Sequence, residues 1–167
     1  MTVTNVMKDP DTLTVAITAE FDATIDQAWQ LWENPRLLER WWGPPTYPAT
    51  FGDHALTPGH VVNYFMTGPA GDRAHGWWRI TSVDAPRLLE FDDGFADDTG
   101  APNPAMPTMV IRVDLIDREG GGVRMVVRTT FPSHEAMEQV LAMGMDEGMT
   151  QAMNQIDDLL TEAAAAG

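Results

Sequence analysis

The sequence contains no cysteine and very little positive charge. Without cysteine, disulfide bonds and thiolate metal sites are excluded. Only ten of the 167 residues are Lys or Arg, against 25 Asp or Glu, so the formal net charge is −15. A charge of this size repels phosphate backbones and anionic lipid surfaces. We therefore expect neither nucleic acid nor a membrane as a partner.

Long apolar runs and common catalytic signatures are also missing. No segment approaches the roughly 20 apolar residues of a membrane-spanning helix, and no basic N-terminal region precedes an apolar run, so we expect a cytoplasmic protein. The patterns G-x-S-x-G, H-E-x-x-H, G-x-G-x-x-G and the phosphate-binding loop are absent. The four histidines form no i, i+4 pair that would chelate a metal. We expect no metal, no cofactor and no catalytic residue of these classes.

Alternating apolar and polar residues dominate the middle of the chain. Residues 12–21 alternate with a period of two, which is typical of a strand with one buried face. Turn-forming residues separate six further segments of this kind. The sequence therefore predicts seven antiparallel strands, at 12–21, 50–56, 61–66, 76–84, 87–95, 109–117 and 123–131.

Helical spacing is confined to two regions. Two short helices follow the first strand, with Asn34 as the cap and Pro35 as the first residue of the second helix. One long helix is predicted from Ser133 to about Ala165. This order predicts an α+β helix-grip fold, a curved seven-stranded sheet wrapped around the long C-terminal helix, in a single domain over 1–167 with its core at about 13–162.

The stretch RWWGPPTYP is typical of a helix end. Gly43 is expected to form a left-handed cap, and Pro44 prevents the helix from continuing. Trp41 and Trp42 point about 100° apart on a helix. If one indole lies in the core, the other lies at the edge of the core, where it would cover the mouth of a cavity. Helical phase alone does not decide which residue has which role.

Two glycines lie on the apolar stripe of the predicted C-terminal helix. Gly144 and Gly148 are four residues apart, and each costs about 1 kcal/mol relative to alanine inside a helix. They are explained either by close packing of the helix on its neighbours or by space left for a ligand. In the second case Met145 and Met149 would form adaptable walls.

One carboxylate falls on an inward face. Alternation in the segment 87–95 places Leu89, Phe91, Asp93 and Phe95 toward the core. Burying an unpaired charge is costly. Asp93 should therefore have a hydrogen-bond donor as its partner or line a wet cavity.

Several of these segments together resemble a known family. The strings FDATIDQAWQLWENPRLLERWWGP, TPGH, HGWWRITSVDAPRLLEFDDGFADDTG and AMGMDEGMTQAMNQIDDLL resemble bacterial relatives of the activator of heat-shock protein 90 ATPase (AHSA-like proteins), in the START-like (SRPBCC) superfamily. The resemblance covers residues 13–162. It implies an apolar cavity between the sheet and the C-terminal helix, with Trp41 in the core and Trp42 outside it. Superfamily relatives bind lipids, hormones or polyketides, and some are cyclases or dehydratases.

The leading hypothesis is a non-enzymatic protein that binds a small hydrophobic or amphipathic ligand. The alternatives are a cyclase or dehydratase in which a cavity carboxylate is the general base, and a chaperone-interacting protein. A monomer and a homodimer are both compatible with the sequence. The residues predicted to surround the ligand are Trp42, Tyr64, Met66, Trp78, Phe91, Asp93, Met109, Ile111, Met125, Val127, Met145 and Met149.

Overall fold

The computed structural model describes residues 2–166, with side chains described as far as Glu162. One antiparallel sheet has the strand order β1-β2-β8-β7-β6-β5-β4-β3. The strands are β1 (Val3–Asp9), β2 (Thr14–Phe21), β3 (Ala49–Phe51), β4 (Val61–Thr67), β5 (Arg73–Asp84), β6 (Leu88–Phe95), β7 (Thr108–Asp117) and β8 (Val123–Thr130). The helices are α1 (Ile25–Glu33), α2 (Pro35–Trp41), α3 (His134–Ala142), α4 (Met145–Met153) and α5 (Ile156–Ala166).

The α+β helix-grip fold predicted from the sequence is confirmed, and the sheet has one strand more than expected. The additional strand is β1, which forms the edge of the sheet and pairs with β2. Five of its seven residues are exposed, including Val6 and Met7. Because β1 has no continuous buried face, it lacks the apolar alternation by which the other strands were recognised.

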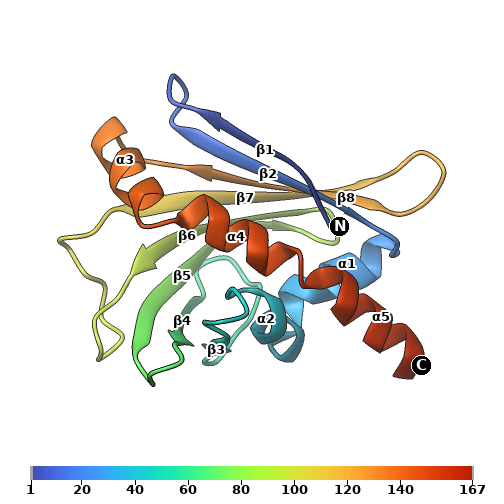
Figure 1. Ribbon diagram of the computed structural model, residues 1–167, viewed down its shortest axis with the longest axis horizontal. Coiled ribbons are helices and arrows are strands. Elements are labelled where there is room, and N and C mark those ends of the chain that lie inside the picture. Colours follow the sequence, from blue (N-terminus) through green and yellow to red (C-terminus); the bar gives the residue numbers. More distant parts are fainter. Residues whose placement is uncertain (1, 167) are drawn as a thin grey trace.

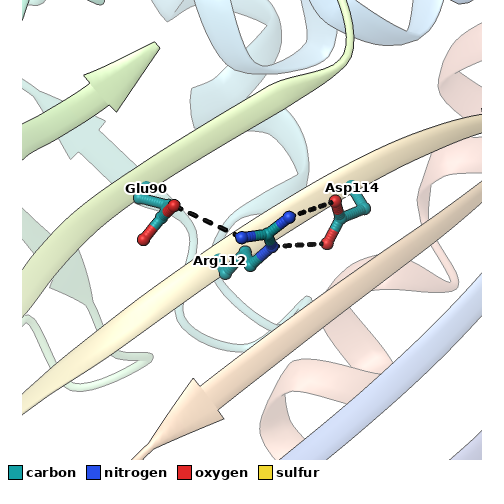
Figure 2. Close-up of polar contacts among 3 residues, drawn as sticks. All are labelled: Glu90, Arg112 and Asp114. Carbon is teal, nitrogen blue, oxygen red and sulfur yellow. Dashed lines mark hydrogen bonds and ion pairs between the residues drawn. The ribbon is translucent and has the colours of Figure 1, made fainter. Parts of the chain in front are cut away.

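The outer face of the sheet carries the charged side chains of the central strands, with single apolar residues between them. Arg112 on β7 reaches Asp114 on the same strand through two nitrogen–oxygen contacts of 3.0 and 3.2 Å, and Glu90 on the neighbouring β6 at 3.5 Å (Figure 2). Exposed ion pairs of this kind each contribute at most about 1 kcal/mol. Their importance here is that they keep this face solvated, so the apolar residues of the strands gather on the opposite, inner face.

Helices α1 and α2 begin where the sequence places capping residues. The Thr24 hydroxyl accepts a hydrogen bond from the Gln27 backbone N–H at 3.1 Å, and the Gln27 side chain accepts one from the Thr24 N–H at 2.9 Å. This is a reciprocal capping box. Asn34 caps α2 through the backbone N–H of Arg36 at 3.0 Å, with Pro35 as the first helical residue, as predicted.

The long C-terminal helix predicted from the sequence is instead three helices. Ser133 caps α3 as expected, but Gly144 has φ +84°, a left-handed conformation that ends α3 and precedes α4. A second break follows at Asn154 and Gln155, where the Gln155 N–H bonds the carbonyl of Ala152, three residues back. Both interruptions are short, so the apolar spacing continues across them and periodicity alone does not detect them.

The three C-terminal helices cross one face of the sheet, and α1 and α2 lie beneath one end of it (Figure 1). α4 contacts β1 and β2, and α5 contacts α2. Gln155, at the second break, donates a hydrogen bond of 2.7 Å to the carbonyl oxygen of Gly43, just beyond α2. Two parts of the chain therefore cover the inner face: the α1–α2 pair and the broken C-terminal helix.

The different conformations of the two helix glycines predict opposite responses to the same substitution. Gly144→Ala should destabilise the protein by about 1–2 kcal/mol, because a Cβ atom is strained at this φ. Gly148→Ala should stabilise it by up to about 1 kcal/mol, because Gly148 is helical and its added Cβ would meet no atom within 4 Å. Urea unfolding of both variants measures the difference, and shifts of the same sign would contradict this account of the helix break.

Candidate functional site

The end of α2 directs its two tryptophans to different places. Trp41 is completely buried, and its indole N–H donates to the carbonyl oxygen of Leu31 at 2.9 Å. The family resemblance placed Trp41 in the core correctly. It placed Trp42 outside the core, but Trp42 is only 3% exposed and belongs to the same buried cluster, with one side on a cavity wall.

Gly43 corrects one expectation. Trp42 still has helical angles (φ −61°, ψ −41°), and Gly43 is not among the glycines with positive φ, so it is not a left-handed cap. A Cβ atom at Gly43 would lie 1.9 Å from the carbonyl oxygen of Tyr47. Glycine is required here because the backbone of the following turn passes so close.

Aromatic rings fill one part of the inner face completely. Trp78 on β5 stacks on Phe91 of β6 with ring centroids 4.1 Å apart. Trp42 meets Trp78 edge-to-face at 4.8 Å, and Trp32 of α1 lies 5.8 Å from Trp42. Aromatic packing of this kind stabilises the fold by more than the buried area of the rings alone would, and it holds the Trp42 indole in one orientation.

Beside these rings lies a cavity of about 230 Å³, which we call the central cavity. The α2 end, the strands and the α3–α4 segment each contribute to its wall. It adjoins a smaller recess of about 140 Å³ that shares five of its residues and adds Ala74, His75 and Gly94. The lining residues are Trp42, Pro44, Tyr64, Met66, Asp93, Phe95, Met109, Val140, Met143, Gly144, Met145, Gly148 and Met149.

The one polar pair in the central cavity is Tyr64 and Asp93. The Tyr64 hydroxyl donates to Asp93 Oδ1 at 2.9 Å, which supplies the donor partner that the sequence required for an inward carboxylate. Among the described residues, Tyr64 is the only one that donates a hydrogen bond to the carboxyl group, because the Trp78 N–H faces it without reaching hydrogen-bonding geometry. The indole N–H groups of Trp42 and Trp78 are buried without an acceptor in hydrogen-bonding geometry among the described residues.

Burial controls the protonation of this pair. Desolvation raises the pKa of Asp93 to about 7, and donors facing the carboxylate, Tyr64 and the Trp78 N–H, partly oppose that rise. The pKa of Tyr64 is raised well above its ordinary value, first by burial and then by the negative charge of Asp93. Asp93 therefore changes its charge near neutral pH, while Tyr64 remains a hydrogen-bond donor.

The predicted ligand-contacting residues divide into two groups. Trp42, Tyr64, Met66, Asp93, Met109, Met145 and Met149 line the central cavity. The remaining five point toward the same face but lie in the packed core, with at most 1% of their surface exposed: Trp78, Phe91, Ile111, Met125 and Val127. Alternation identifies the inner face but does not indicate where along that face the packing leaves a space.

Sequence reasoning missed six lining residues. Phe95 has the same inward alternation as Asp93, and Val140 lies on the apolar stripe of the C-terminal helix, so both had a usable signal. Gly144 and Gly148 had two possible explanations, close packing and space for a ligand, and were not assigned to the site. Pro44 and Met143 carry no such signal, because they lie at a helix end and at the α3–α4 break, whose geometry the sequence does not reveal.

Gly148 is the clearest sign that the central cavity is not filled by its own side chains. It lies in α4 facing the cavity, and a Cβ atom there would have no neighbour within 4 Å. At a helix glycine that allows close packing, an added Cβ atom would instead meet atoms of a neighbouring element. The sequence left open whether the helix glycines serve packing or space, and at this position the structure favours space.

A second, larger hollow of about 510 Å³ lies between β1 and α4. Its walls are Val6, Lys8, Asp146, Glu147, Thr150 and Gln151. Lys8 pairs with Asp146 at 2.6 Å, and this cation lowers the pKa of Asp146. The hollow is wide open to solvent, and two of its three charged residues, Lys8 and Asp146, already pair with each other, so the central cavity is the better candidate site.

Comparison with known proteins places this geometry in a family. The family model described as activator of Hsp90 ATPase homolog 1-like protein matches residues 22–161. The chain belongs to this family. No protein of curated function matches the chain.

Solved structures of other members have the same fold over almost their whole length. A crystal structure of a protein from Mycobacterium smegmatis is 49% identical, with a TM-score of 0.87, covering 95% of this chain and 96% of the other. A solution structure from Arthrobacter aurescens is 50% identical, with a TM-score of 0.92 and coverage of 96% and 93%. One from Staphylococcus epidermidis is 26% identical, with a TM-score of 0.81 and coverage of 96% and 95%.

Within the described part of this family member, no group of three or more His, Asp or Glu side chains is arranged to hold a metal ion. The helices described here are too short or too polar to cross a membrane. The central cavity offers apolar walls, one carboxyl group and one phenol.

The raised pKa of Asp93 predicts a pH-dependent effect of Asp93→Asn on stability. The folded protein binds the Asp93 proton more tightly than the unfolded chain, so this stabilisation is complete below about pH 4 and is lost as the pH rises through about 7. Asn stays neutral throughout. The variant should therefore gain about 2 kcal/mol relative to wild type between pH 5 and pH 8.

Urea unfolding at both pH values measures this gain. Asp92→Asn is the matched control, because it removes the same charge from the neighbouring residue on the outer face of β6. If Asp93→Asn and Asp92→Asn change with pH in the same way, the carboxyl group of Asp93 is not desolvated as described.

Proposed function

We propose that the protein binds a small apolar or amphipathic molecule in the central cavity. The observation that carries this proposal is a desolvated carboxyl group facing unfilled apolar space. The Asp93 carboxyl has a free oxygen, and Gly148 on the opposite wall leaves room that a larger side chain would occupy. Both features cost stability in a protein without a ligand.

The chemistry of the walls agrees with this function. Ligand sites are mostly apolar, with a few polar groups that fix orientation. Here five methionines at the α3–α4 segment and the facing strands, Met66, Met109, Met143, Met145 and Met149, provide polarisable and adaptable contacts. The Tyr64–Asp93 pair provides the orienting polar groups. The cavity volume favours a small molecule over a long lipid.

Gly148→Leu tests this proposal by filling the cavity. We expect the variant to fold with unchanged or higher stability and to bind prodan, a neutral environment-sensitive dye, at least about tenfold more weakly. Gly148→Ala is the matched control and should retain most of the binding. Fluorescence titration measures both, and native mass spectrometry of freshly purified protein looks for a molecule that co-purifies.

Equal dye affinity of wild type and Gly148→Leu would contradict binding in the central cavity. A urea melt shows whether the Leu variant is folded. It therefore distinguishes loss of binding through unfolding from loss of binding because the cavity is filled.

A second candidate, an enzyme of the cyclase or dehydratase type, is favoured by the pKa of Asp93. A carboxyl group that titrates near 7 is suited to accept a proton at physiological pH. In such a reaction Asp93 would take a proton from a carbon beside a carbonyl group, and the Tyr64 hydroxyl would donate a hydrogen bond to the resulting oxyanion.

Exchange of the α-hydrogens of cyclohexanone in D₂O tests this second candidate. If Asp93 is a general base, the wild-type protein should accelerate the exchange above the buffer rate, and Asp93→Asn should abolish the acceleration while still binding prodan. Exchange at the buffer rate, measured by NMR with wild-type protein that binds prodan, would leave the protein as a binding protein only.

Chaperone contact has less support among the described residues. The large exposed hydrophobic side chains are distributed over β1, β4, β7 and the α3–α4 break: Val6, Met7, Val61, Val110, Ile116 and Met143. Surface hydrophobic residues that occur singly are normal in proteins, and docking surfaces are larger contiguous patches.

A further inference from the structure

The central cavity has an unusual balance of charge. Asp93 is the only charged side chain among its lining residues, and neither Lys nor Arg is present there. Ligand sites for fatty acids and other carboxylates need a cation or several donors to replace lost hydration. In this cavity a carboxylate would instead face another carboxyl group.

The free oxygen of Asp93 has the opposite preference. Tyr64 donates to Oδ1, and the Trp78 N–H faces the carboxyl group without reaching hydrogen-bonding geometry, so among the described residues Oδ2 is left without a hydrogen bond of its own. A ligand that donates a hydrogen bond would complete the coordination of this carboxyl group. A cationic donor would do so most strongly, since charge-assisted hydrogen bonds are about twice as strong as neutral ones.

Aromatic rings border the same position. Trp42 and Tyr64 both line the cavity and meet nearly at right angles, with an interplanar angle of 87° and centroids 6.3 Å apart. Phe95 lines the cavity beside Asp93. A cation beside such rings is attracted by their π-electrons, by about 0.5–2 kcal/mol depending on its hydration.

We propose that the cavity selects amines, so that the ligand is a small apolar molecule ending in an ammonium group, which binds Asp93 beside the rings of Tyr64 and Trp42. This inference rests on the proposed function. Desolvation normally offsets much of the energy of a buried ion pair. The desolvation of Asp93 is already present in the folded protein, so ligand binding adds only that of the ammonium group. The net charge of −15 further enriches cations around the protein.

The titratable groups around Asp93 are few, which makes the pH dependence interpretable. Tyr64 on β4 is its hydrogen-bond partner, and His75 on β5 lines the adjoining recess. The residues that α3 and α4 contribute to the cavity are uncharged. Amine binding needs ionised Asp93, so amine affinity should rise as the pH rises through about 7. His75→Gln separates any contribution of the histidine charge from that of Asp93.

Three ligands with the same tail test the proposal: octylamine, octan-1-ol and octanoate. At pH 8.5 and about 0.15 M salt, isothermal titration calorimetry should show octylamine binding at least about tenfold more tightly than octanol, and octanoate at least about tenfold more weakly. At pH 5.5 the advantage of the amine should fall. In Asp93→Asn the affinities for amine and alcohol should come within about threefold of each other.

Asp92→Asn is again the matched control, because it removes a neighbouring charge that lies outside the cavity, and it should behave like wild type. A preference for amine that persists in Asp93→Asn would mean attraction to the acidic surface, and would overturn the inference. Octanol binding with no preference for the amine would also overturn it, while leaving the proposed function intact. If none of the three ligands binds and Gly148→Leu does not affect prodan, both proposals fail.

Discussion

Every strand except β1 buries apolar side chains on the inner face of the sheet, so this face has to be covered. The outer face carries the ion pairs of Arg112 and its neighbours. The cover is uneven. Near α1 and α2 the rings of Trp32, Trp41 and Trp78 fill the space without a gap. Near α4 the side chains become methionines and glycine, and a cavity remains. The position of the candidate site follows from this transition along one face.

Trp42 lies at the transition. It packs against the ring cluster on one side and forms the cavity wall on the other. The Gly43 carbonyl oxygen next to it accepts a hydrogen bond from the Gln155 side chain, so the end of α2 is connected to the C-terminal helices. The cavity wall formed by α2 is therefore held by a contact outside the cavity, and a ligand would need to do little to order it.

The break at Gly144 has a related consequence. A continuous helix would run straight across the sheet, whereas the left-handed residue redirects the chain between α3 and α4. Met143 is 59% exposed and yet lines the cavity, so the break lies at its boundary with solvent. The α3–α4 break is thus where a ligand would enter with the smallest loss of packing.

Much of this arrangement was predictable from the sequence. The rest was not, and each failure has a physical reason. Alternation located six strands and the inward carboxylate of Asp93, and the capping residues Asn34 and Ser133 marked real helix starts. The strand predicted at 50–56 was too long, because β3 ends at Phe51. The edge strand β1 lacks a buried face, and the break at Gly144 keeps the apolar spacing, so neither leaves a periodic signal. Phe91 and Met109 have the same inward alternation, but only Met109 lines the cavity, because that depends on which neighbours fill the space.

The central claim is that the central cavity holds Asp93 in a desolvated state that a ligand can use. Titration of the ¹³Cγ chemical shift of Asp93 by NMR measures this directly, with Asp93→Asn used to assign the signal. The account predicts a midpoint near pH 7 in the free protein. A midpoint near 3.9, the value of an ordinary aspartate, would show that the carboxyl group is solvated, and would contradict it.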